Sequence, residues 1–293
     1  MSAPLSGKFT LNDLRSARTN AKKVPMLTCY DYATARVMEQ AGVPTLLVGD
    51  SAANVVLGYD TTLPVSLEFM AEITAAVRRG APNALVVADM PFGSYQGSVA
   101  RGVKNVCRMV QLSSCDGVKI EAAETQLRLV RELSDAGVAI VTHLGLRPQA
   151  VGMMGGYKFQ GRTADEARGI VSLARRMERA GAAALLIEAV PPEVSEAVVA
   201  AVSIPVMGCG AGPACDGHVI VTHDALLLTE RAPKFVPILG DLSNAMRQYF
   251  SDYVRLVEDG RYPAHEHNYT MAPDEREKFA GRSLPNLSGT ATE

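Results

Sequence analysis

Acidic side chains directly follow short apolar runs at four places in this 293-residue chain: Asp50, Asp89, Glu121 and Glu188. Packing alone rarely puts a carboxylate there, because a buried carboxylate has to be paired or bound to a metal ion. Any one of them alone could be a turn residue, a loop residue or half of an ion pair. Four at equivalent positions favour a shared site, and we predict that this site binds a divalent metal ion.

The types of these side chains and of their neighbours indicate which metal ion and which substrate contacts the site favours. Carboxylates without a His–Cys cluster suit a hard ion such as Mg²⁺ better than zinc. Lys119 lies two residues before Glu121, on the same side of a strand. Such a lysine either forms a Schiff base or stays protonated and holds a substrate carboxylate, and the carboxylates favour the second role. His143 ends the fifth apolar run, where it would either bind the metal or hydrogen-bond to a neighbouring group.

Eight apolar runs rich in Val, Ile, Leu and Ala predict strands that are buried on both faces of a parallel sheet. Helix-like segments separate them, and this alternation predicts a (β/α)8 barrel, whose active site lies at the C-terminal ends of the strands. The predicted strands are 26–29, 45–49, 84–88, 117–120, 138–142, 183–187, 204–208 and 218–222; the predicted helices are 31–41, 67–79, 98–112, 124–136, 163–180 and 192–201.

An open, doubly wound sheet is the alternative fold. It predicts a glycine-rich phosphate loop after the first strand. The chain instead has Tyr30-Asp31-Tyr32-Ala33 there, which favours the barrel.

Domain boundaries follow from composition and capping. We expect residues 1–9 to be flexible, and a helix that caps the barrel to begin after Thr10. A single barrel domain is predicted over 10–262, with a closing helix over 242–258. The polar segment 263–293 is predicted to be a flexible extension.

Two loops are long for this fold. Residues 145–161 form a glycine-rich loop that is either a mobile lid over the site or an ordinary crossing loop. Residues 208–212, Gly-Cys-Gly-Ala-Gly, either hold a phosphate or pack tightly at the rim. We expect Cys209 to be a buried, inert thiol and His223 to have a local capping role.

Composition excludes several partner classes. The formal net charge is -2 and there is no Trp, so neither nucleic acid nor an anionic membrane is expected as a partner. The five cysteines include no CxxC pair, which argues against a disulfide framework and a zinc site. Residues 1–20 contain no apolar core flanked by basic residues, so we expect no signal peptide and a cytoplasmic location.

Several motifs together resemble one known family. They are Gly49-Asp50-Ser51, the segment 59–65 (YDTTLPV), Asp89-Met90-Pro91, Lys119-Ile120-Glu121, His143-Leu144-Gly145-Leu146, the segment 155–161 (GGYKFQG), Glu188 and the segment 208–217 (GCGAGPACDG). In this order they are similar to the ketopantoate hydroxymethyltransferase family over residues 10 to 260. Three sites depart from the family pattern: Ala122-Ala123 replaces Gly-Gly after Glu121, Ala52-Ala53 replaces a larger apolar residue after Ser51, and Ser113-Ser114-Cys115 stands where an Ala-Gly turn is common.

The resemblance implies a barrel of the phosphoenolpyruvate/pyruvate type. It implies transfer of a hydroxymethyl group from 5,10-methylenetetrahydrofolate, the co-substrate, to 3-methyl-2-oxobutanoate, with one Mg²⁺ per subunit in a homodecamer. The implied metal ligands are Asp50, Asp89 and Glu121, the last directly or through water. Asp50, Ser51, Asp89 and Lys119 are implied to hold the keto acid, and Glu188 to be the general base.

Two other functions remain open from the residues. One is a different metal-dependent lyase or aldolase of the same barrel superfamily, acting on another small acid. The other is a barrel that binds a small acid without catalysis.

Overall fold

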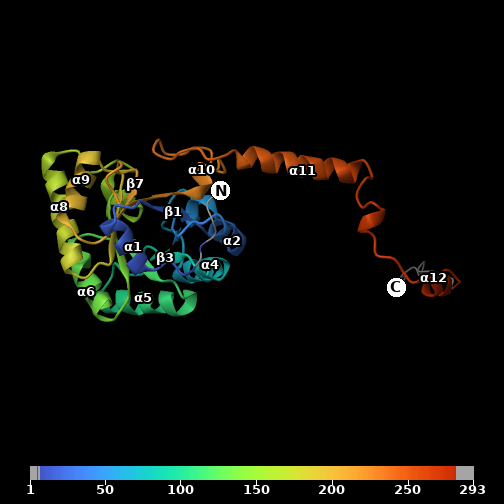
Figure 1. The fold of residues 1–293 in the computed structure, drawn as a ribbon, viewed down its shortest axis with the longest axis horizontal. Coiled ribbons are helices and arrows are strands. Elements are labelled where there is room, and N and C mark those ends of the chain that lie inside the picture. The colour runs from blue at the N-terminus through green and yellow to red at the C-terminus, as the bar shows by residue number, and fades with distance from the viewer. Residues whose placement is uncertain (1–4, 6, 282–293) are drawn as a thin grey trace, which may run out of the picture. The chain divides into compact units, whose positions relative to one another are not determined.

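The strands form one closed parallel barrel in the order β1 to β8 (Figure 1). In this computed structural model residues 5 and 7–281 are described. The chain divides into two compact units, Met1–Asp241 and Leu242–Glu293. The barrel lies in the first unit.

All eight predicted strands occur among the described residues, with ends shifted by at most three residues. β5 begins two residues later than predicted, because the amide of Val138 instead bonds to the Leu133 carbonyl. The strands are β1 (Val24–Thr28), β2 (Thr45–Val48), β3 (Leu85–Asp89), β4 (Gly117–Glu121), β5 (Ile140–Gly145), β6 (Ala184–Glu188), β7 (Val206–Cys209) and β8 (Gly217–Ile220).

The predicted helices surround these strands (Figure 1). Several begin at side chains that accept a bond from the first helical turn, as N-caps do: Asp31 before α2, Ser66 before α4 and Thr163 before α8. The helices of the first unit are α1 (Leu11–Thr19), α2 (Tyr32–Gln40), α3 (Ala52–Val55), α4 (Leu67–Gly80), α5 (Val99–Ser113), α6 (Leu127–Asp135), α7 (Val151–Met154), α8 (Ala164–Arg179), α9 (Pro192–Ala201) and α10 (Thr222–Ala225), with 3-10 turns η1 (Glu124–Gln126) and η2 (Pro148–Ala150).

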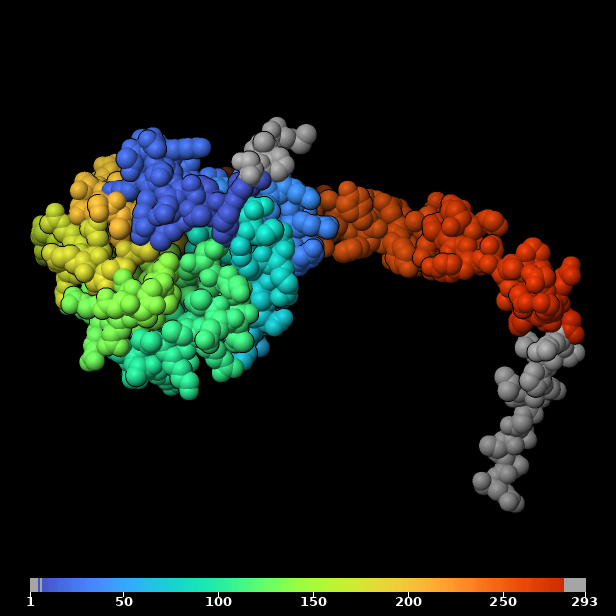
Figure 2. Space-filling view, turned by 60° about the horizontal axis from the view of Figure 1, so that its bottom comes forward, coloured from blue at the N-terminus to red at the C-terminus, as the bar shows by residue number. Residues whose placement is uncertain are grey.

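Helix α1 closes the N-terminal end of the barrel. Leu14 and Ala17 pack in one buried cluster with inward-facing strand residues such as Met26, Leu47 and Met207. The N-terminal segment, dark blue, lies across the barrel in Figure 2. The predicted capping helix is therefore present, and it leaves the opposite end of the strands for the site.

Two residues near the start of the chain form hydrogen bonds with residues of the barrel unit. Lys8 Nζ donates to Asp116 Oδ2 at 2.6 Å and the amide of Phe9 bonds to the Asn83 carbonyl. These two residues belong to the segment that we predicted to be flexible. Residues 1–4 and 6 of that segment lie outside the described residues.

The second unit contains α11 (Leu242–Glu258), η3 (His265–His267) and α12 (Pro273–Ala280). Helix α11 has the predicted bounds, but the compact barrel unit ends before it, at Asp241 rather than at 262. Of the predicted extension 263–293, residues 282–293 lie outside the described part. Within the described residues, no helix combines the length and apolar character needed to span a membrane.

Candidate active site

The predicted chemical residues gather at the C-terminal ends of neighbouring strands. Asp89, Glu121 and Glu188 are the last residues of β3, β4 and β6, and Asp50 follows β2. A cavity of about 430 Å³ opens there. Its lining includes Asp50, Ser51, Asp89, Lys119, His143 and Glu188, but not Glu121.

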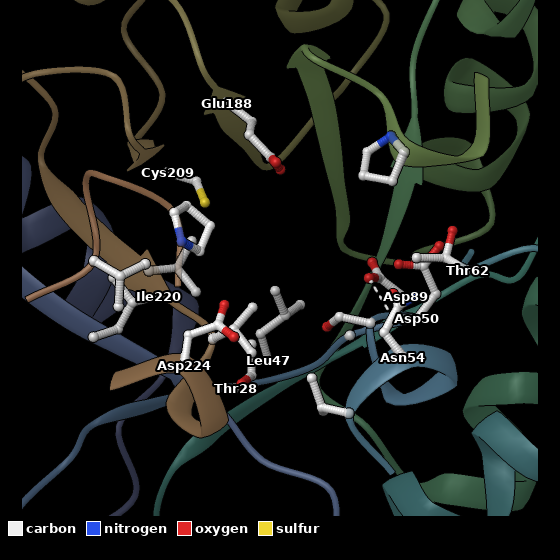
Figure 3. Close-up of a pocket in the computed structure, with 18 of the residues that line it drawn as sticks. Thr28, Leu47, Asp50, Asn54, Thr62, Asp89, Glu188, Cys209, Ile220 and Asp224 are labelled. Atoms are coloured by element: carbon white, nitrogen blue, oxygen red, sulfur yellow. Dashed lines mark hydrogen bonds between the residues drawn. The ribbon is translucent and has the colours of Figure 1, made fainter. Parts of the chain in front are cut away.

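Asp50 and Asp89 lie side by side on one wall of this cavity, and Glu188 projects from another wall (Figure 3). The Asp50 amide donates to Asp89 Oδ2 at 3.0 Å. Asp89 Oδ1 lies 2.8 Å from Lys119 Nζ in a buried ion pair. When both carboxyl groups are ionised, one ammonium balances only one of them, so this wall then has an excess of negative charge.

Burial and neighbouring charges shift the pKa values of the ionisable groups on this wall. Burial and the Asp50 charge raise the pKa of Asp89 to about 7, although Lys119 opposes the shift. Burial alone would lower the pKa of Lys119, but the charges of Asp89 and Asp50 raise it above its ordinary value. Lys119 is therefore an ammonium at neutral pH, and this favours the electrostatic role over a Schiff base.

Lys119 also contacts His143, which in turn contacts Glu188. Lys119 Nζ lies 3.3 Å from His143 Nδ1, and His143 Nε2 lies 3.2 Å from Glu188 Oε2. Burial and the Lys119 charge lower the pKa of His143, so its ring is neutral. Because an ammonium can only donate, Nδ1 accepts and the proton lies on Nε2, facing Glu188. His143 thus lies between the Lys119 ammonium and the Glu188 carboxylate, although its Nε2 makes no hydrogen bond among the described residues.

Ser51 begins the short turn after β2 and lines the same cavity. Its Oγ is 2.8 Å from the hydroxyl of the buried Tyr30. Tyr30 does not line the cavity, so when its hydroxyl donates to Ser51, the Ser51 hydroxyl is the one that can donate to a bound carboxylate.

Glu121 is held differently from the other carboxylates. Its Oε1 accepts a 2.8 Å bond from the Gln149 amide, and burial raises its pKa to about 8. Within the described range, no three His, Cys, Asp or Glu residues converge as a metal-binding group. Asp50, Asp89 and Glu121 therefore do not converge as three direct ligands, and the implied role of Glu121 through water stays a prediction.

Sequence reasoning missed two buried residues beside the carboxylates, Gln149 and Tyr95. Gln149 Nε2 donates to Asp50 Oδ2 at 2.8 Å, and the Tyr95 hydroxyl donates to Gln149 Oε1 at 2.8 Å. Neither residue ends an apolar run or falls into a motif with a known spacing. Only the long loop after β5 marked the region that contains Gln149.

The two long loops differ in their relation to the cavity. The loop 145–161 contains η2 and α7, and its Pro148 and Tyr157 line the cavity, as a lid or wall residue would. In the loop 208–212, Cys209 lines the cavity and is half-buried rather than buried as predicted; desolvation raises its pKa well above the ordinary value, which disfavours a reactive thiolate. His223 packs edge-on against Tyr30, 5.3 Å between ring centroids.

Residues 8–265 match the sequence model of the family described as ketopantoate hydroxymethyltransferase. The chain belongs to this family. It is 42% identical to a 3-methyl-2-oxobutanoate hydroxymethyltransferase of Desulfotalea psychrophila (strain LSv54 / DSM 12343), over 93% of this chain and 98% of the relative. It is 43% identical to the enzyme of that name from Geobacillus thermodenitrificans (strain NG80-2), over 86% and 91%.

A likeness to solved structures supports the fold. The phosphoenolpyruvate phosphomutase of Streptomyces platensis subsp. rosaceus superposes with a TM-score of 0.59 at 15% identity, covering 92% of this chain and 97% of that one. The predicted family and the closed (β/α)8 barrel are thus both confirmed. The role of each site residue stays a prediction.

Proposed function

We propose that this chain transfers a hydroxymethyl group from 5,10-methylenetetrahydrofolate to 3-methyl-2-oxobutanoate, giving ketopantoate for pantothenate synthesis. The observation that carries the proposal is one cavity in which the Asp50–Asp89 pair lies across from Glu188, in a chain of this family. Net transfer consumes one water: the folate methylene and water give the hydroxymethyl group, and tetrahydrofolate leaves.

Asp50 and Asp89 would hold one Mg²⁺ per subunit. Mg²⁺ prefers oxygen ligands and is commonly bound by one or two carboxylates together with substrate and water. The excess negative charge of this wall fits a divalent cation. Glu121, whose Oε1 accepts from the Gln149 amide, would act through water rather than as a direct ligand. When bound, the ion would polarise the keto group and make the C3 proton of the keto acid more acidic.

The substrate carboxylate needs donors and positive charge. Ser51, with Tyr30 behind it, offers a hydroxyl donor, and the Lys119 ammonium brings a positive charge to the cavity lining. Asp50 and Asp89 complete the proposed keto-acid site. These groups would fix the acid so that C3 faces the opposite wall, where Glu188 lies.

Glu188 would remove the C3 proton as the general base. The side chain of Glu188 is partly accessible to the cavity, and His143 Nε2–H faces its Oε2. A neutral imidazole at this place would leave the base without a positive charge beside it. Carbon C3 would then attack the methylene carbon supplied by the folate and form the new carbon–carbon bond.

The proposal also covers the oligomeric state of the protein and its location in the cell. Helix α11 has exposed apolar side chains within its own unit, which supports a homo-oligomer, and the resemblance suggests ten subunits. The small-molecule pathway and the absence of any disulfide among the described cysteines agree with a cytoplasmic location.

A direct assay tests the activity. Purified full-length protein with Mg²⁺, 3-methyl-2-oxobutanoate and 5,10-methylenetetrahydrofolate is expected to form ketopantoate. Exchange of the C3 proton with solvent deuterium, measured without folate, isolates the first step. Exchange without ketopantoate would point to another enzyme of the superfamily, and the absence of both would indicate a barrel that only binds.

A further inference from the structure

Gln149 is buried at the base of the loop that follows β5, in the turn η2. Its side chain and backbone both contact the acidic strand ends. Nε2 donates to Asp50 Oδ2 at 2.8 Å and to the Met90 carbonyl at 2.9 Å. The backbone amide donates to Glu121 Oε1 at 2.8 Å.

Two further bonds fix which way the Gln149 amide points. Its Oε1 accepts from the Tyr95 hydroxyl at 2.8 Å and from Gln96 Nε2 at 3.0 Å. Reversing the amide would place its NH₂ against the Gln96 NH₂ and its oxygen against the Asp50 carboxylate, so the reversed orientation is disfavoured. Tyr95 is in turn fixed, because its hydroxyl accepts from the Glu121 amide at 3.0 Å.

We propose that Gln149 is a positioning residue for the divalent cation. It binds one oxygen of Asp50 and leaves the other to the cation, and it holds Glu121 away from a direct ligand position. The inference rests on the proposed function, because it assigns a role toward the ion that Asp50 and Asp89 would hold. It adds a residue from the β5 loop to a site otherwise built from strand ends.

The chemistry of an amide suits this place. Gln149 donates to Asp50 without bringing a charge of its own, so the wall keeps the negative charge that attracts the cation. An apolar residue of similar size would leave Asp50 Oδ2 without this donor and free to rotate. Loss of such an outer partner typically costs about 10- to 100-fold in metal affinity.

The test uses Gln149→Met, which keeps side-chain volume and removes both donor and acceptor. The matched control is Gln160→Met, in the same loop, whose Nε2 donates to the Lys158 carbonyl and to no other described residue. Mn²⁺ binding to the full-length protein is measured by electron paramagnetic resonance titration, alongside thermal unfolding. We expect Gln149→Met to weaken Mn²⁺ binding about 10- to 100-fold, and Gln160→Met to bind as the wild type does.

A second variant tests the same role without replacing Gln149 itself, in case Gln149→Met does not fold. Tyr95→Phe removes the hydroxyl that orients the Gln149 amide and is expected to weaken Mn²⁺ binding in the same direction, by less. Wild-type Mn²⁺ affinity in both variants would overturn the role of Gln149. A lower melting temperature with unchanged affinity would do the same, since it would mean a purely structural residue. If the wild type itself bound no Mn²⁺, the proposed metal site would fail instead.

Discussion

Glu188 is the residue on which the proposed chemistry depends most directly. Replacing it by Gln keeps the size and the contact with His143 but removes the base. We expect Glu188→Gln to slow C3–H exchange of the keto acid by about 10²- to 10⁴-fold, as loss of a general base typically does. Binding of the keto acid, measured by calorimetry, should change little. Exchange at the wild-type rate would remove Glu188 from this role.

Asp89 and Glu121 make stability depend on pH when no metal is bound. Burial raises their pKa values from 3.8 to about 7 and from 4.5 to about 8. At pH values between the ordinary and the raised pKa of each group, the folded chain still holds a proton that the unfolded chain has lost. Their contribution to stability is therefore complete below about pH 4 and is lost as pH rises through about 7 to 8.

The measurement compares melting temperatures in EDTA and in Mg²⁺ across this window. In EDTA the contribution of these two carboxyl groups should lower the melting temperature between about pH 5 and about pH 8. The control variant Asp89→Asn should show a smaller decline, because one of the two groups no longer ionises. Mg²⁺ should recover stability at the upper end. An equal decline in wild type and Asp89→Asn would show that Asp89 does not titrate here.

At the residue scale, the sequence predicted the groups that end buried strands and missed those that support them. Asp50, Asp89 and Lys119 could be found because strand-end position and charge are visible in the chain. Gln149 and Tyr95 could not, because their role depends on loops of different strands meeting in space. The same contacts explain why Glu121 does not join the Asp50–Asp89 pair, which no spacing rule could indicate.

At the scale of elements, the junction of β5 and β6 controls where Glu188 lies. Gly145 ends β5 opposite Glu188, with a φ of +84°. A Cβ at Gly145 would come within 2.2 Å of the Glu188 carbonyl oxygen. Alanine there must therefore displace the backbone that carries the proposed base.

We expect Gly145→Ala to lower both the melting temperature and the rate of C3–H exchange. The left-handed conformation alone costs an L-residue roughly 1–2 kcal/mol, and the clash adds to this. Gly152→Ala is the matched control, because no atom lies within 4 Å of its added Cβ. Equal exchange rates in the two variants would show that the position of Glu188 tolerates a shift of β6.

The elements themselves were the most predictable part of the fold. The apolar runs and the helix-like segments between them predicted the eight strands and their alternation with helices, because strands buried on both faces leave a clear hydrophobic signal. Strand ends were less certain, as β5 shows: Val138 continues the apolar run but closes the turn after α6. The division at Asp241 was missed, since α11 has the same amphipathic pattern whether it covers a barrel or another surface.

At the scale of the whole molecule, α11 has an apolar stripe that its own unit leaves open. Phe250, Tyr253, Val254 and Val257 follow the i, i+3, i+4, i+7 spacing of one helix face. Phe250 is 61% exposed and Tyr253 56% exposed. Exposed apolar surface of this kind commonly marks a contact between proteins. In the proposed homo-oligomer, the partner at this surface would be a second copy of the chain.

We therefore expect native mass spectrometry of the wild type to show an assembly of many subunits, ten if the resemblance holds. Phe250→Glu/Tyr253→Glu would bury charge in that contact and should shift the protein to smaller species. Ser251→Glu adds charge to the same helix outside the stripe and should leave the assembly intact. Circular dichroism distinguishes loss of assembly from loss of fold. A monomeric wild type, or a double variant that assembles normally, would show that α11 does not hold the subunits together.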